Sequence, residues 1–156
     1  MAPITFARLP QVDPARILAH MSDPRLADHL PLLTPGWTLD TVAAFVAAKE
    51  SCWQRDGLGH WAILHGGDYA GWGGFQKEGT DWDYGLVLRP DCFGLGLAIT
   101  RQALDFARSD PRIPSVTFLL PPSRRHLGAL ARMGAHAEGM VEHSGQTFRK
   151  FRLPTA

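Results

Sequence analysis

The sequence is poor in cysteine, in long apolar runs and in charge of one sign. Its two cysteines, Cys52 and Cys92, form neither a Cys-x-x-Cys pair nor the two pairs of a zinc site, which excludes a disulfide framework and favours a reducing compartment such as the cytoplasm. No uncharged apolar run reaches the roughly 18 residues of a membrane span, and the N-terminus lacks the apolar core of a signal peptide. The 16 Lys and Arg residues balance 15 Asp and Glu residues, so no broad basic surface is expected for nucleic acid or an anionic membrane.

Size and apolar content predict one globular domain that spans residues 1–156. The chain has 156 residues, 45% of them hydrophobic, and a chain of this mass buries roughly 69% of the surface that it exposes when extended. Its 16 Gly and 12 Pro residues stay below the level of low-complexity sequence, and its five Trp residues argue against disorder. The sequence contains no internal repeat and no linker-like stretch.

Helix caps and turns divide the N-terminal part of the chain. An alternating strand is predicted over residues 4–9. Asp13, followed by a proline, is typical of a helix N-cap, and residues 22–24 repeat this arrangement. Thr38 is expected to cap a longer helix, which Gly57 closes.

Hairpins and two further helices are predicted for the rest of the chain. A Gly-Gly pair between apolar runs supplies the positive φ angles that a tight reversal needs. The predicted elements are a hairpin over residues 60–76, strands at 81–88 and 115–120, helices at 94–108 and 123–133, and a terminal hairpin at 135–153. The order β-α-α-β-β-β-α-β-α-β-β predicts an α+β fold, with a mixed, mostly antiparallel sheet of about seven strands and about four flanking helices.

Two glycines lie where a predicted strand gives way to a predicted helix. Between Leu88 and Ile99, Gly94 and Gly96 expose backbone N–H groups at the start of the helix, an arrangement that binds phosphate. A nucleotide triphosphate loop would require Gly-Lys-Ser/Thr, which is absent, and a dinucleotide fingerprint would require a third small residue at the position of Ile99. Another phosphate-containing ligand and an ordinary glycine-rich helix start remain as the alternatives.

The glycine loop and the order of elements resemble those of the GNAT superfamily of acetyl-CoA-dependent N-acetyltransferases. The signature Q/R-x-x-G-x-G/A of that superfamily aligns with residues 93–98, where the glycine and alanine positions match and Phe93 replaces Gln or Arg. An aromatic residue is common there in the branch that resembles ribosomal-protein N-terminal acetyltransferases, and residues 83–98 are similar to its tract eiGYwl-p-ywGkGlatEA. Residues 35–45 and 132–134 extend the resemblance over most of the chain.

The resemblance implies that acetyl-CoA is the cosubstrate. The pantetheine arm of the coenzyme would pair, as an added strand, with the backbone of Leu86, Val87 and Leu88. Ser123 takes the position of an Asn that touches this arm in the family, and Leu130 takes that of the frequent general-acid Tyr. The pyrophosphate would lie against the N–H groups of Phe93, Gly94, Leu95, Gly96, Leu97 and Ala98.

The resemblance also places the candidate catalytic groups. Asp83 aligns with the acidic residue before the Gly-Tyr of the branch, which makes it the first candidate for the base that takes the proton of the attacking amine. Asp81, on the same strand face, is the substitute, and a solvated surface position is the alternative for Asp83. Tyr84 is a candidate donor to the leaving thiolate, with a core position as its alternative, and His126 is a candidate acid.

The acceptor is expected to be a primary amine, either a protein N-terminal α-amine or a small-molecule amine. At pH 7, neutralising an α-amine of pKa about 7.7 costs roughly 1 kcal/mol, against roughly 4.6 kcal/mol for a lysine amine near 10.4, so a modestly equipped site suits α-amines. The local charge is typical of an ordinary solvated face, and the functional alternative is that Asp81 and Asp83 favour a cationic amine substrate. No Ser or Cys nucleophile with an adjacent base is evident, which favours direct transfer over a covalent intermediate.

Histidine placement gives little sign of a further site. No set of His, Asp and Glu has metal-ligand spacing, so no metal is expected. His20 and His29 lie in the helical pair that lines the acceptor pocket in the family, although such histidines are mostly surface groups. Arg124 or Arg125 is a candidate contact for the coenzyme 3′-phosphate. The family is consistent with a homodimer, and a non-catalytic acyl-CoA-binding module is the second functional hypothesis.

Overall fold

The computed structural model describes residues 2–27, 36–122 and 128–156. Its strands are β1 (Ile4–Ala7), β2 (His60–His65), β3 (Asp68–Glu78), β4 (Asp81–Leu88), β5 (Ser115–Leu120), β6 (His136–His143) and β7 (Gln146–Pro154). Its helices are α1 (Pro14–Met21), α2 (Pro24–Ala27), α3 (Leu39–Asp56), α4 (Gly96–Ser109) and α5 (Gly128–Met133), with 3₁₀ helices η1 (Leu9–Gln11) and η2 (Pro90–Leu95). None of the helices in these ranges is both long and apolar enough to cross a bilayer.

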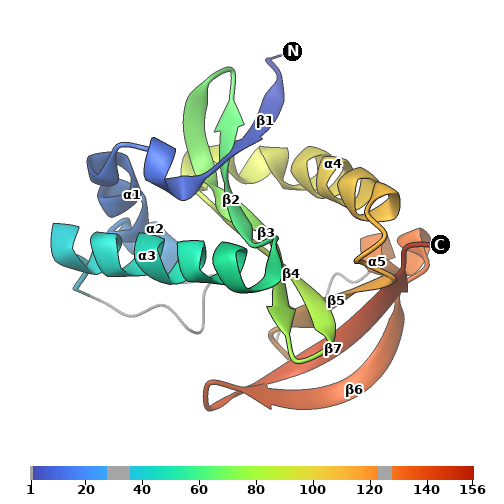
Figure 1. The fold of residues 1–156 in the computed structure, drawn as a ribbon. Helices are drawn as coiled ribbons and strands as arrows, with labels where there is room; N and C mark the ends of the chain where they lie inside the picture. The colour runs from blue at the N-terminus through green and yellow to red at the C-terminus, as the bar shows by residue number, and fades with distance from the viewer. Residues whose placement is uncertain (1, 28–35, 123–127) are drawn as a thin grey trace.

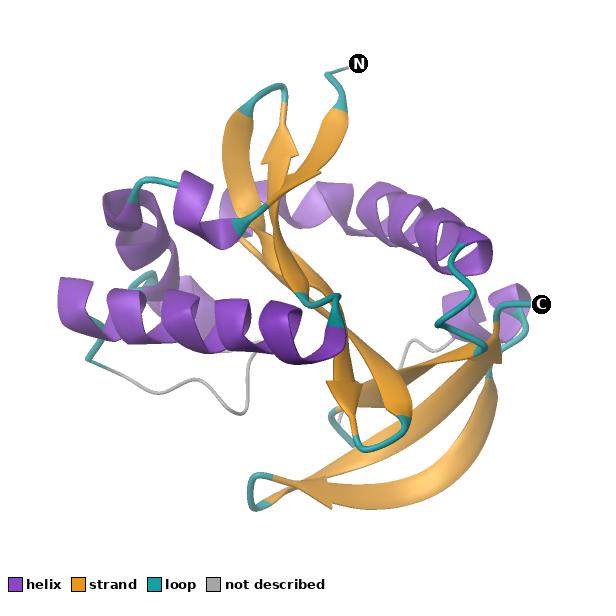
Figure 2. Cartoon of the chain, in the orientation of Figure 1, coloured by secondary structure: helices purple, strands orange, loops and turns teal. Residues whose placement is uncertain are grey.

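All described strands join one twisted sheet. Their spatial order is β1-β2-β3-β4-β5-β7-β6. The pair β4 and β5 is parallel, and every other neighbouring pair is antiparallel. In Figure 1 and Figure 2, α1 and α3 lie on one side of this sheet, and α4 and α5 lie on the other. The predicted α+β class, with a mixed and mostly antiparallel sheet of seven strands, is confirmed.

Local caps and turns form where the sequence predicts them. The Asp13 carboxylate accepts a hydrogen bond from the N–H of Ala15 at 2.9 Å, which caps α1. Thr38 caps α3, and Gly57 ends that helix in the left-handed conformation at φ 75°. The Gly66-Gly67 pair turns β2 into β3 with φ angles of 60° and 85°, as a tight hairpin requires.

Residues of β4 alternate between the two faces of the sheet. Trp82 and Tyr84 belong to the apolar cluster on the α4 side, together with Leu104. Val87 belongs to the cluster on the opposite side, with Val42 of α3. Asp81 and Asp83 share the parity of Val87, so they face the side of the sheet on which α3 lies.

The start of α4 differs from the prediction. The helix was expected to begin at Gly94, but the chain first forms the 3₁₀ helix η2, and α4 begins at Gly96. The N–H of Cys92 donates to the carbonyl of Arg89 at 2.7 Å, a tight turn that starts at the proline-containing end of β4. A further single-turn helix, α2, follows the Asp23 cap, so the described residues contain five α-helices instead of about four.

Strands β3 and β4 approach so closely that two glycines of β3 are required. A Cβ atom at Gly71 would lie 2.3 Å from the carbonyl oxygen of Val87, and one at Gly73 would lie 2.3 Å from that of Gly85. Neither oxygen can move without disturbing the ladder that joins the two strands. The glycines therefore fix the position of β4, the strand that carries the candidate site.

We expect Gly73→Ala to destabilise the fold by at least about 2 kcal/mol, because the new methyl group would overlap the backbone of β4. Gly85→Ala is the matched control in the same strand pair, since its Cβ would meet only the His60 ring at 3.7 Å. Urea unfolding should therefore show a lower midpoint for the Gly73 variant and a near-wild-type midpoint for the Gly85 variant. Equal midpoints for all three proteins would contradict this account.

Candidate functional site

The parallel strands β4 and β5 pair over a short distance and then part. Their register joins Trp82 with Val116, Asp83 with Thr117 and Tyr84 with Phe118, whereas β4 stays paired with β3 as far as Leu88. Residues 85–88 of β4 therefore have no strand partner on the β5 side within the described chain. The separation leaves an open strand edge in the middle of the sheet.

Backbone groups of alternate residues point to this open edge. The N–H of Arg89 donates to the carbonyl of Ala70, so Arg89 faces β3. The β3–β4 register is uninterrupted, and residues of an antiparallel pair alternate between the two sides. Leu86 and Leu88 consequently direct their N–H and C=O groups to the open edge, whereas Val87 directs its own to β3.

The glycine loop lies directly beyond this edge. Gly94 is in η2 and has no atom within 4 Å of the place that a Cβ would take, and a Cβ at Gly96 would meet only the Leu88 side chain at 3.8 Å. Neither glycine has a positive φ, so the fold itself does not require glycine at either position. Space beside the backbone suits close approach of a ligand. The N–H of Gly96 is already engaged, because it donates to the carbonyl of Phe93.

Asp83 lies beside the point where the strands part. The hydroxyl of Thr117, its partner on β5, donates to the Asp83 carboxylate at 3.0 Å. Burial raises the pKa of Asp83 to about 7, although this hydrogen bond acts in the opposite direction. The carboxyl is half-buried, so the surface alternative is wrong, and near neutral pH it exists in both protonation states.

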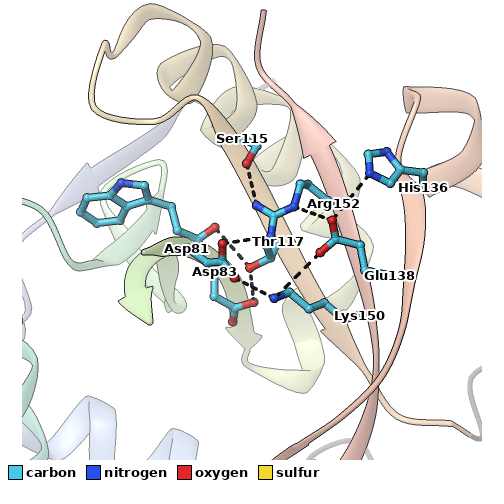
Figure 3. Close-up of polar contacts among 9 residues, drawn as sticks. Asp81, Asp83, Ser115, Thr117, His136, Glu138, Lys150 and Arg152 are labelled. Carbon is cyan, nitrogen blue, oxygen red and sulfur yellow. Dashed lines mark hydrogen bonds and ion pairs between the residues drawn. The ribbon is translucent and has the colours of Figure 1, made fainter. Parts of the chain in front are cut away.

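Asp81, two residues earlier on the same face, has opposite properties. It accepts hydrogen bonds from Lys150 at 2.7 Å and from Arg152 at 2.9 Å, and these partners lower its pKa. Arg152 also contacts Glu138 at 2.7 Å, which links β4 to the β6–β7 hairpin (Figure 3). Asp81 therefore carries a stabilised negative charge and is a weaker candidate for the base than Asp83.

A cavity whose lining includes four acidic residues opens on the face that carries Asp83. Its volume is about 160 Å³. The lining residues come from β3 to β7 and are Glu78, Asp81, Asp83, Thr117, Leu119, Val141, Glu142, His143 and Lys150. Lys150 is paired with Asp81, whereas Glu78 and Glu142 make no ion pair among the described residues. The cavity thus presents an excess of carboxylates on the face of the sheet that carries Asp83.

Tyr84 occupies the opposite face of β4. Its hydroxyl lies 2.9 Å from the Thr100 hydroxyl of α4, its side chain belongs to the α4-side core, and burial raises its pKa to about 12. Leu130 of α5 packs against the same core cluster. These positions separate Tyr84 from the cavity on the Asp83 side.

Several positions predicted for the site lie outside the described residues. They are Ser123, Arg124, Arg125, His126 and His29. His20 is described and is buried, which contradicts its assignment to the surface. No group of three or more His, Cys, Asp and Glu side chains with the geometry of a metal site occurs in the described parts of the chain.

Sequence reasoning missed Thr117, Lys150 and Glu78 as neighbours of Asp83. The alternation of β5 assigns Thr117 to the face opposite Val116 and Phe118, so a polar residue between apolar ones was a usable signal. The contact of Lys150 with Asp81 depends on the β5–β7 pairing. In the sheet, β7 lies between β5 and β6, although β6 precedes β7 in the sequence. The sequence has no local signal for this order.

Comparison with known proteins places this geometry in a known fold. No family model matches the sequence, and no curated protein matches it. An acetyltransferase from Agrobacterium tumefaciens is similar with a TM-score of 0.71 and 21% identity, over 96% of this chain and 89% of that one.

Two further solved structures are similar to this chain over nearly its whole length. A GNAT-family acetyltransferase from Bacillus anthracis has a TM-score of 0.70 at 15% identity, over 99% of this chain and 97% of its own. Spermidine N-acetyltransferase from Vibrio cholerae, solved with CoA and spermine, has a TM-score of 0.75 at 10% identity, over 97% and 95%. The chain has the fold of the GNAT acetyltransferases.

Proposed function

We propose that residues 1–156 form one acetyl-CoA-dependent N-acetyltransferase domain that transfers the acetyl group directly to a primary amine. The observation that carries the proposal is the position of Asp83, a half-buried carboxyl with a pKa near 7 beside the point where β4 and β5 part. A group that titrates near neutral pH is suited to accept a proton during the reaction. The open edge of β4 and the glycine loop that follows this strand would supply the place for the coenzyme.

The coenzyme arm would extend β4 at its open edge. Leu86 and Leu88, whose backbone groups point outward, would pair with the pantetheine amides as one strand pairs with another. The diphosphate would lie against the loop at Gly94 and the first turn of α4, where the free space beside both glycines and the N-terminal end of a helix favour an anion. The N–H of Gly96 would exchange its carbonyl partner for a phosphate oxygen.

Acetyl transfer then requires proton removal and stabilisation of developing charge. The neutral amine attacks the thioester carbonyl, the C–N bond forms, and the negative charge on the carbonyl oxygen is stabilised by N–H donors of the β4 edge. The C–S bond breaks as CoA leaves as a thiolate. Asp83 takes the proton of the amine, directly or through water, with the Thr117 hydroxyl holding its carboxylate in place.

The cavity supports a cationic acceptor. Glu78 and Glu142 line it with Asp83 and lack ion-pair partners among the described residues, so they favour an ammonium group. Spermine is bound in the structure of the similar spermidine N-acetyltransferase, and a small polycationic amine is therefore one acceptor class to test. A protein N-terminal α-amine, the acceptor class of the resembling ribosomal-protein branch, is the other.

A non-catalytic acyl-CoA-binding module is the second candidate function. It is supported by Leu130, which packs into the core at the position where the family commonly has a general-acid Tyr. Such a module would need the open edge and the glycine loop but not the titrating carboxyl of Asp83. The two functions differ in turnover and not in coenzyme binding.

Thiol release from acetyl-CoA tests the enzymatic function. We expect the purified protein to release CoA in the presence of spermidine or of one member of an N-terminal peptide panel, with acetylated product seen by mass spectrometry. Tight acetyl-CoA binding without turnover on any acceptor would support the binding module. Absence of acetyl-CoA binding would exclude both functions.

Substitution of the glycines tests the loop. We expect Gly94→Val or Gly96→Val to abolish measurable CoA binding in calorimetry, because each side chain would fill the space that the diphosphate needs. The fold should persist, since neither position has a positive φ or a close neighbour. Asp105→Val, on an exposed position of the same helix, is the control and should bind CoA as the wild type does. Unchanged affinity in both glycine variants would place the diphosphate elsewhere.

The pH dependence of kcat/KM tests Asp83. Because the base must be ionised, the rate should rise with pH up to about 7, and Asp83→Asn should lose this rise and at least about 10²-fold in kcat. Thr117→Val should move the rise to higher pH, since the Thr117 hydrogen bond lowers the pKa of Asp83. Asp81→Asn, a matched carboxylate that is ion-paired, should keep the rise. A pH profile that survives in Asp83→Asn would remove Asp83 as the base.

A further inference from the structure

His60 of β2 lies almost wholly inside the protein, and its ring makes no hydrogen bond among the described residues. Only 7% of the residue is exposed. Its Nδ1 atom is sealed from solvent and has no hydrogen-bond partner. The Nε2 atom also lacks a partner in the described part of the chain, but it is not sealed from solvent. An imidazole held in this way is costly for a folded protein and calls for a reason.

Two glycines let the His60 ring reach the central strand. The strand registers place His60 opposite Gly74 of β3 and Gly74 opposite Gly85 of β4, so the three residues form one row across the sheet. Because neither glycine carries a side chain, the imidazole extends along this row. A Cβ at Gly85 would lie 3.7 Å from both Cε1 and Nε2 of His60. The side of the ring that carries Nε2 therefore faces β4.

Gly85 is the residue at which the open edge of β4 begins. Residues 85–88 have no strand partner on the β5 side among the described residues. Asp83 and Val87 flank Gly85 on the same face, so the Nε2 side of the His60 ring meets β4 between these two side chains. Trp72 lies on the other side of the ring, with the two ring centroids 5.5 Å apart. A ring nitrogen, the proposed base and the open strand edge thus meet in one place, although they come from different strands.

The surroundings of the His60 ring assign its proton to Nε2. Burial and the nearby ammonium group of Lys49 keep the pKa of His60 well below its ordinary value, so the ring is neutral at pH 7 and carries one proton. A proton on Nδ1 would be a sealed donor without an acceptor. Buried N–H groups without a partner are rarer in proteins than acceptors without one. With the proton on Nε2, the ring presents a neutral hydrogen-bond donor to β4 at Gly85.

We propose that His60 is a catalytic residue, whose Nε2–H donates to the carbonyl oxygen of the acetyl group of bound acetyl-CoA beside Gly85. The inference rests on the proposed function, because it needs the thioester at the β4 edge. When the amine attacks, the electrons of the carbonyl π bond move to this oxygen, and they return when the C–S bond breaks. The Nε2–H group stabilises the negative charge between these two events and keeps its own proton. A neutral imidazole suits this role, since it polarises the carbonyl while Asp83 accepts the proton of the amine.

Steady-state kinetics separate this role from a structural one. We expect His60→Leu to lower kcat at least about 10²-fold, the effect of losing one donor to the oxyanion, with a KM for acetyl-CoA within about threefold of wild type. His60→Gln retains an N–H donor on a side chain of similar reach, so its kcat should exceed that of His60→Leu by at least about tenfold. Wild-type kcat in His60→Leu, or equal losses in the Leu and Gln variants, would overturn the proposal.

His65→Leu is the matched control on the same strand. His65 ends β2 and lies on the opposite face from His60. The same change of residue type at this position should leave kcat and KM at their wild-type values. A loss in His65→Leu equal to that in His60→Leu would show that the rate depends on the stability of β2, and it would overturn the catalytic assignment.

Nuclear magnetic resonance of the wild type keeps the test independent of variant folding. With ¹⁵N-labelled histidine, the free protein should carry the His60 ring proton on Nε2 at pH 7. Acetyl-CoA should move the Nε2 signal, whereas CoA, which lacks the acetyl carbonyl, should leave it nearly in place. The two ligands differ only in the acetyl group, so the difference reports on the proposed contact.

The outcomes distinguish the inference from the proposed function. If both ligands bind and move the His60 signals equally, or if neither moves them, the inference fails and the proposed function stands. A ring proton on Nδ1 would also overturn the inference alone. If acetyl-CoA does not bind to the wild-type protein, the proposed function fails and the inference fails with it.

Discussion

The separation of β4 from β5 after a single short run of pairing is the constraint on which the rest of the site depends. If β4 and β5 paired along their whole length, the backbone of β4 would be hydrogen-bonded on both sides. The sheet would then have no open strand edge in its middle. Instead, pairing stops at Tyr84 and Phe118, while β3 holds β4 straight as far as Leu88. Gly71 and Gly73 of β3 permit the close approach of the two strands on this paired side. The open edge, the loop that follows it and the carboxyl beside it are all consequences of this one divergence.

Asp81 and Asp83 lie on the same face of β4, but their neighbours shift their pKa values in opposite directions. Asp81 and Asp83 are two residues apart, and the same alternation directs both to the cavity side. Lys150 and Arg152 stabilise the ionised form of Asp81, whereas burial destabilises that of Asp83, so their pKa values move in opposite directions. Lys150 and Arg152 of β7 thus pair with Asp81 and Glu138, whereas Asp83 makes no ion pair among the described residues.

Much of the fold was predictable because its signals are local. The caps at Asp13 and Thr38 and the Gly66-Gly67 turn act within a few residues, and each formed as predicted. The start of α4 was missed by two residues, since an Arg89 turn inserts a 3₁₀ segment that hydrophobic spacing does not reveal. Asp83 was found through resemblance, but its burial and the ion pairs of Asp81 depend on strand neighbours distant in sequence. The burial of His20 is likewise a tertiary property, set by packing of α1 on β3 and β4.

The alternation of β4 also has a consequence for how the chain can vary in length. Its odd-numbered side chains face the cavity side and its even-numbered ones the α4-side core, so adding or deleting one residue in the Gly79-Thr80 turn would exchange the two sets. Trp82 and Tyr84 would enter the cavity, and both aspartates would enter an apolar core. Insertions are therefore admissible at the Ser144-Gly145 turn between β6 and β7, which lies at the far edge of the sheet, but not between β3 and β4. The outer hairpin can therefore change its length without exchanging the two faces of the central strand.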